Sequence, residues 1–155
     1  MIQRIQSVYL FLVFVFSILY IVLPLAKFPA VMPDMPLRVI QYNEFLIATG
    51  VSGSWIGALL IVLFAMGALV TVYTTFLYRK RITQIRLGKY NMVIHTAIIL
   101  ASFFFVDHIR KQVSDADFSY GVGIIFPVIS LFLILMANRS IRRDEELVRS
   151  ADRIR

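Results

Sequence analysis

The stretch Arg79-Lys80-Arg81-Ile82-Thr83-Gln84-Ile85-Arg86-Leu87-Gly88-Lys89 carries five positive charges and no acidic residue. It lies between two long apolar runs, Trp55–Tyr78 and Asn91–Val106. Lys and Arg concentrate in the cytoplasmic loops of membrane proteins, so a cationic turn between two such runs indicates which side of the bilayer each segment occupies. The stretch therefore predicts a cytoplasmic turn flanked by two membrane spans.

The composition of the chain is typical of a membrane protein. Of its 155 residues, 59% are hydrophobic and 16% are charged, whereas soluble domains contain about 25% charged residues. The chain has no cysteine, which excludes disulfides and thiolate chemistry. The net charge of +7 follows from the cationic bias of cytoplasmic segments, so we expect no nucleic-acid partner.

Four apolar runs are long enough to cross a bilayer. The first is predicted to be an uncleaved span, because Val8–Leu23 exceeds the ~7–15 apolar residues of a signal peptide and no small-residue cleavage site follows. The last contains Pro127, which we expect to bend the helix or free a carbonyl group. The predicted spans of this single membrane domain, 1–155, are 5–25, 55–78, 90–106 and 120–137.

The distribution of positive charge predicts the topology. Twelve of the 16 Lys and Arg residues fall on the side of the basic stretch and four on the other. This places both termini in the cytoplasm, with periplasmic segments 26–54 and 107–119 and cytoplasmic segments 79–89 and 138–155. The predicted fold is an all-α membrane protein, a four-transmembrane-helix antiparallel bundle with a helical cytoplasmic C-terminal tail.

The longest connection, 26–54, leaves two structures open. Prolines at positions 24, 29, 33 and 36 break any helix there. The pattern of Leu37–Thr49 fits either a short pair of strands or an interfacial helix.

His95 lies well inside the third predicted span, and ionisable residues at such positions are candidates for function. One interpretation is a polar pocket open to the cytoplasm, with His95 accepting a proton or contacting a ligand. The other, which we favour, is a set of interhelical hydrogen bonds in which neutral His95 pairs with a threonine hydroxyl. The candidate polar cluster is Thr71, Thr74, Thr75, Asn91, His95, Ser102 and Ser130.

Small residues suggest where helices approach closely. Gly53 and Gly57 form a G-x-x-x-G pattern at the start of the second span, and Gly121 and Gly123 open the fourth at a matching depth. We expect contact between these two spans within one chain, with a homodimer through the same face as the alternative.

The C-terminal tail combines charge pairs with a thin apolar stripe. Arg142–Glu146 and Glu145–Arg149 are spaced at i,i+4, so they support a helix that lies on the membrane surface or against a protein partner. The candidate docking residues are Arg142, Arg143, Glu145, Glu146, Arg149 and Arg153. The basic stretch could hold lipid headgroups through Arg79, Lys80, Arg81, Arg86 and Lys89, although topology alone explains those charges.

Several chemistries are disfavoured. A metal site needs three or four converging ligands, and the two histidines, His95 and His108, belong to opposite ends of a span. No acidic residue lies inside a predicted span, which counts against ion-coupled transport. A glycine-rich phosphate loop, paired carboxylates and a Ser/His/Asp arrangement are likewise missing, so we predict no metal or cofactor.

The two ends of the chain resemble a known family. The opening Met1–Leu10 (MIQRIQSVYL) and the closing Ala137–Arg153 (ANRSIRRDEELVRSADR) are similar to those of small integral-membrane proteins of Bacteroidota, filed as a domain of unknown function. The resemblance covers the whole chain and implies four spans in a Gram-negative inner membrane. It carries no activity over to any residue.

The sequence thus predicts an accessory or scaffolding subunit of a membrane complex, docking a membrane-protein or cytoplasmic partner through its tail. The alternative is a small carrier or channel around His95, and an enzyme ranks third. A water-filled cavity reaching His95 would favour transport, whereas a packed interior with an exposed apolar stripe on the tail would favour scaffolding.

Overall fold

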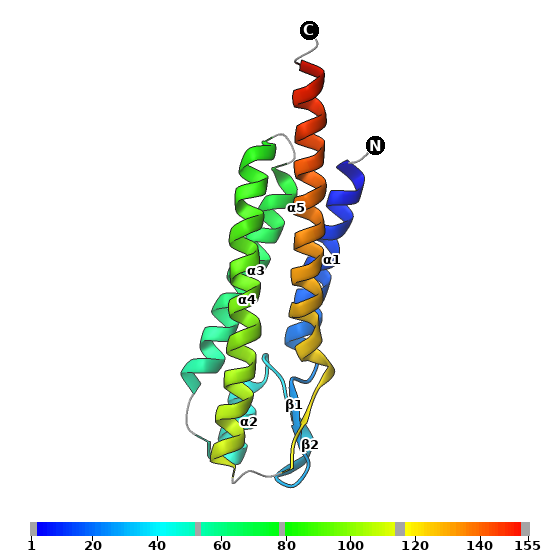
Figure 1. Cartoon of the computed structure of the whole chain (residues 1–155). Coiled ribbons are helices and arrows are strands. Elements are labelled where there is room, and N and C mark those ends of the chain that lie inside the picture. The colour runs from blue at the N-terminus through cyan, green and yellow to red at the C-terminus, as the bar shows by residue number, and fades with distance from the viewer. Residues whose placement is uncertain (1–2, 52–53, 78–79, 114–116, 153–155) are drawn as a thin grey trace.

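A computed structural model describes residues 3–51, 54–77, 80–113 and 117–152. Its four long helices lie side by side and run antiparallel in sequence order, and the first turn of α1 and the last turns of α5 lie at the same end (Figure 1). Each of the four is long and apolar enough to cross a membrane. The predicted all-α four-helix bundle is therefore confirmed. The helices are α1 (Gln3–Val22), α3 (Ser54–Phe76), α4 (Arg81–Gln112) and α5 (Ile125–Asp152).

The helices form a ring in which every neighbour is antiparallel. α5 packs mainly on α1 and α4, and α3 packs mainly on α4 and α1. The buried residues of α4 recur at alternating steps of four and three, which is the spacing of helices that cross at a shallow angle of about 20°. This buried row, the α4 seam, contains Gln84, Gly88, Asn91, His95, Ile98, Ser102, Phe105 and Ile109.

The basic stretch is helical where a turn was predicted. α4 begins at Arg81, so residues 81–89 form its first turns. The reason is packing on both sides: the Gln84 side chain donates to the Thr74 carbonyl of α3 at 3.1 Å, and Gly88 faces the Asn138 side chain of α5. At its other end α4 continues to Gln112, so the first part of the predicted loop 107–119 is also helical.

The connection between α1 and α3 contains both structures that the sequence left open. β1 (Ala26–Phe28) pairs antiparallel with β2 (Met32–Leu37) and with β3 (Ser119–Tyr120), in the order β2-β1-β3. α2 (Tyr42–Thr49) follows, and Gly50 ends it in the left-handed conformation at φ 67°, which glycine adopts without strain. Together these elements form a cap over one end of the bundle (Figure 1).

Pro127 lies in the first turn of its helix, whereas the sequence placed it inside the fourth span. A short 3₁₀ helix, η1 (Val122–Ile124), comes first, and α5 begins at Ile125. The amides of a first helical turn have no partner inside the helix, so a proline there removes no intrahelical hydrogen bond. α5 then continues to Asp152, which confirms the predicted helical tail.

Tyr42 of the cap lies between α3 and α4 at the capped end of the bundle. Its ring packs against Gly57 of α3, where a Cβ atom would overlap it, and meets Phe105 of α4 edge-on with centroids 6.2 Å apart. Gly57 is therefore covered by the cap of its own chain.

The predicted contact between the glycines of the second and fourth spans does not form. Gly121 and Gly123 pack instead against the backbone at Leu23 and Pro24. The physical reason is the ring order, because α3 and α5 are diagonal to each other. Gly53 lies outside the described residues.

Gly57→Ala should destabilise the protein. Alanine is the better helix former, so helix propensity alone predicts a gain of about 1 kcal/mol. Overlap with the Tyr42 ring should reverse the sign and cost ~1–3 kcal/mol, as overpacked cores do. Reversible unfolding in detergent measures the change. In a Tyr42→Ala background the same substitution should be neutral or stabilising. A loss of similar size in both backgrounds would show that overlap with the Tyr42 ring is not the cause.

Candidate functional site

The predicted polar cluster lies inside the bundle, on three of the four long helices. Six of its seven side chains are buried and Thr75 is half-buried. Hydrocarbon cannot hydrogen-bond these groups, so turning them inward is the only low-energy arrangement for a membrane protein. The residues are Thr71, Thr74 and Thr75 on α3, Asn91, His95 and Ser102 on α4, and Ser130 on α5.

Asn91 makes the interhelical hydrogen bond that the sequence suggested for His95. Its Nδ2 donates to Thr71 Oγ1 at 2.7 Å, and the Thr71 hydroxyl donates to the Gly67 carbonyl at 2.8 Å. His95 Nδ1 lies 3.0 Å from the Asn91 carbonyl of its own helix. Because a carbonyl oxygen only accepts, Nδ1 carries a proton, and Nε2 of the neutral ring is left as an acceptor.

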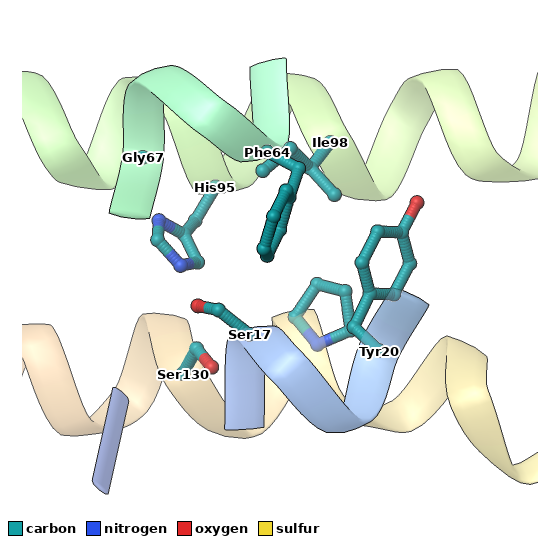
Figure 2. A pocket seen from close by; sticks show the side chains of 8 residues that line it. Ser17, Tyr20, Phe64, Gly67, His95, Ile98 and Ser130 are labelled. Carbon is teal, nitrogen blue, oxygen red and sulfur yellow. The ribbon is translucent and has the colours of Figure 1, made fainter. Parts of the chain in front are cut away.

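A small cavity lies beside the His95 ring. Figure 2 shows the imidazole facing Ser17 and Ser130, so four helices converge on one space. The cavity offers about 10 Å³ to the centre of a water molecule, which is the room that a single water needs. Ser130 Oγ and Asn91 Oδ1 are buried without a hydrogen-bond partner among the described residues. The site can therefore hold one water, and it has no room for a larger solute.

A second polar link was not predicted from the sequence. The Tyr20 hydroxyl of α1 lies 2.7 Å from Ser102 Oγ of α4. Ser102 Oγ lies 2.6 Å from the Ile98 carbonyl and donates to it, so Tyr20 is the donor toward Ser102. Tyr20 looks like any interfacial aromatic residue near the end of an apolar run, and no local signal distinguishes its inward position.

The third link holds the terminal end of the bundle and centres on a buried acid. Gln6 Nε2 of α1 donates to Asp144 Oδ2 of α5, and Arg81 of α4 donates to the Asp144 carbonyl at 3.2 Å. Asp144 is only 7% exposed, although the sequence placed it in the cytoplasmic tail outside the bundle. Its position does continue a heptad pattern, which was the missed signal. That pattern, the α5 seam, is Pro127, Ser130, Ile134, Ala137, Ile141 and Asp144.

The predicted docking and headgroup residues are mostly exposed. Arg142 Nε lies 3.8 Å from Glu146 Oε1, so this predicted pair forms on the helix surface. Arg143, Arg86, Lys89 and Lys80 are exposed, whereas Glu145 and Arg81 are half-buried. Arg79, Arg153 and the side chain of Arg149 lie outside the described part of the chain. Within that part, no group of three or more His, Cys, Asp or Glu residues could hold a metal ion.

Comparison with known proteins adds a family. A family model described as "Domain of unknown function (DUF4293)" matches residues 2–154. The chain belongs to this family. No curated protein and no solved structure matches it. The match spans all four long helices, so this DUF4293 domain is the complete bundle with its cap and tail.

In this DUF4293 chain, the geometry of the polar cluster is that of cross-linked helices. The links connect α3 to α4 through Asn91, α1 to α4 through Tyr20, and α1 to α5 through Gln6. The first two satisfy groups that the hydrocarbon core would leave unpaired. The arrangement stabilises one packing of the helices and encloses one water-sized space.

Thr71→Val should destabilise the bundle more than Thr75→Val. Both threonines donate to a carbonyl in α3, Thr71 to Gly67 and Thr75 to Thr71. Thr71 alone also accepts the hydrogen bond from Asn91. The difference between the variants should be about 0.6–2 kcal/mol, the range of interhelical hydrogen bonds in membranes. Unfolding in detergent measures it, and equal losses would show that the Asn91–Thr71 bond does not stabilise the bundle.

Proposed function

We propose that this protein is an accessory or scaffolding subunit of an inner-membrane complex, and that the end of α5 docks the partner. The observation that carries the proposal is the reach of α5. Its last turns stand beyond the ends of the other helices (Figure 1), and they expose apolar side chains there. Leu147 is 53% exposed and Val148 44% exposed.

Asp144 marks the boundary between the bundle and this free end. Up to Asp144 the α5 seam is buried, and the carboxylate and carbonyl of Asp144 bond to α1 and α4. The next position of the seam repeat is Val148, which protrudes. A groove of about 470 Å³ lies beside it, lined by residues 80–83 at the start of α4 together with Glu145 and Val148. An apolar position surrounded by charges of both signs suits a protein partner.

The alternative function, a small carrier or channel around His95, has less support. The cavity at His95 has room for one water, and the cross-links beside it stabilise closed packing. A larger hollow, about 670 Å³ between α3 and α4, is an open groove on the outer face of the bundle. Its lining is mostly apolar, as expected of a surface that faces lipid. A packed interior therefore favours scaffolding.

The proposed location is the inner membrane of a Gram-negative bacterium, with both termini cytoplasmic. Two arguments support it: the twelve-to-four distribution of Lys and Arg, and the resemblance of both ends of the chain to a Bacteroidota family. The helical arrangement is compatible with this topology, because the first turn of α1 and the end of α5 lie at one end of the bundle (Figure 1).

Deleting residues 145–155 should release the partner and leave the bundle intact. The deletion keeps Asp144 and its contacts with Gln6 and Arg81. Native membranes solubilised in a mild detergent provide the measurement, since the full-length protein should migrate as a complex larger than the protein itself. The truncated protein should insert normally and migrate alone.

The matched control replaces residues 145–155 with a helical sequence of the same composition in scrambled order. Docking through specific contacts requires that the scrambled tail also fails to retain the complex. If it retains the complex, or if truncated and full-length proteins migrate alike, the proposed docking role of the tail is wrong.

Reporter fusions test the topology. Alkaline phosphatase fused after Arg155 should be inactive, and a fluorescent protein at the same site should fluoresce, because phosphatase folds only outside the cytoplasm. Phosphatase inserted at the β1–β2 turn should be active. An active C-terminal phosphatase fusion would contradict the proposed orientation.

A further inference from the structure

The surface between α1 and α5 has a groove that combines apolar and cationic side chains. It encloses about 530 Å³ at the end of the bundle where both helices have their outermost turns. Its size is within the ~300–1,000 Å³ of typical ligand sites. Ile5 and Tyr9 line it from α1, and Met136, Arg139, Ser140 and Arg143 line it from α5.

The groove is formed by one face of α1 and one face of α5. Ile5 and Tyr9 are four residues apart, as are Met136 and Ser140 and as are Arg139 and Arg143, so each pair shares one side of its helix. The neighbouring contact of Gln6 with Asp144 holds α1 and α5 together at this level.

Arg139 and Arg143 differ from the other basic residue of these turns. Arg142 pairs with Glu146. Both groove arginines are exposed, and neither forms an ion pair with a residue that the structure describes. Two guanidinium groups one helical turn apart repel each other, and an anion between them removes that cost. Guanidinium matches the geometry of phosphate oxygens with two parallel N–H donors.

The order of the side chains along the groove indicates which anion. Arg139 follows the end of the apolar run of α5, at the depth expected for lipid headgroups. Met136 lies one turn deeper, and Tyr9 lies one turn deeper in α1 than Ile5. The cationic end is therefore at the membrane surface, and the apolar end continues into the hydrocarbon.

We propose that this groove binds one anionic phospholipid from the leaflet at the terminal end of the bundle. Its phosphate sits between Arg139 and Arg143 with the Ser140 hydroxyl donating to it, and an acyl chain lies along Tyr9 and Met136. Basic pockets between membrane helices bind such headgroups. Arg143, predicted from the sequence to dock a protein, then contacts lipid, and the docking segment of α5 begins at Glu145.

Native mass spectrometry of the full-length protein in detergent tests the site with phosphatidylglycerol as the probe and phosphatidylcholine as the neutral reference. We expect one phosphatidylglycerol to bind with higher affinity than phosphatidylcholine. Arg139→Gln with Arg143→Gln should weaken binding roughly 25-fold, about fivefold for each charge. Lys27→Gln with Lys111→Gln is the matched control, because it removes the same charge from exposed positions at the capped end of the bundle. It should change affinity less than twofold.

Two further experiments distinguish lipid binding in the groove from non-specific attraction between charges. Met136→Trp fills the apolar part, keeps both arginines, and should also weaken binding, while thermal unfolding checks that each variant is folded. Inorganic phosphate at the same concentration should not displace the lipid. The proposal fails if both charge variants lose affinity equally, if the two lipids bind alike, if Met136→Trp has no effect, or if free phosphate displaces the lipid.

Discussion

The structure depends on one constraint: a polar group that faces hydrocarbon has no water to pair with. The bundle meets it by placing polar side chains on the seams of α4 and α5 and pairing them across helices. Asn91 with Thr71, Tyr20 with Ser102 and Gln6 with Asp144 join different helix pairs at successive levels. The outward faces stay apolar, as exposed Leu69, Val93 and Phe104 illustrate. The polar links thus hold the four helices in one arrangement, since Tyr20 of α1 reaches α4 across the ring, and apolar packing fills the levels between the links.

The two ends of the bundle are built differently. At the capped end, Phe28, Phe45 and Phe105 belong to one apolar core that joins β1, α2 and α4. Tyr42 inserts between α3 and α4 there, and β3 ties the start of α5 to β1. At the terminal end the contacts are polar and involve Gln6, Arg81 and Asp144. An apolar core suits a closed end, whereas a polar end leaves charged and apolar side chains available to lipid or protein.

The sequence predicted those features of the fold that follow from residue composition and from the spacing of apolar and charged residues. The lengths of the apolar runs predicted the four helices, and the alternation of cytoplasmic and periplasmic segments predicted their antiparallel order. The i,i+4 charge pairs around Glu145 predicted the helical tail. Six members of the candidate polar cluster are buried inside the bundle, as expected of polar residues in apolar spans. Pair identity was not predictable, since whether Asn91 or His95 reaches Thr71 depends on helix rotation. The start of α4 was also predicted incorrectly. Positive charge at residues 81–89 indicates which side of the membrane they lie on, but it does not prevent them from being helical. The predicted glycine contacts do not form. Small residues show where a helix can approach a neighbour closely, whereas the order of the helices in the ring determines which neighbour that is.

Asp144 shows how the α5 seam connects fold and proposed function. The buried Asp144 carboxylate accepts a hydrogen bond from Gln6, and the Asp144 backbone carbonyl accepts one from Arg81. The seam therefore ends with polar contacts, whereas an apolar residue at this position would allow packing to continue. Residues before it lie against α1 and border the lipid groove at Arg139. Residues after it border the groove at the start of α4 and present Leu147 and Val148 outward. One helix can therefore contact lipid and protein at different levels, because the hydrogen bonds of Asp144 hold its orientation fixed between the two.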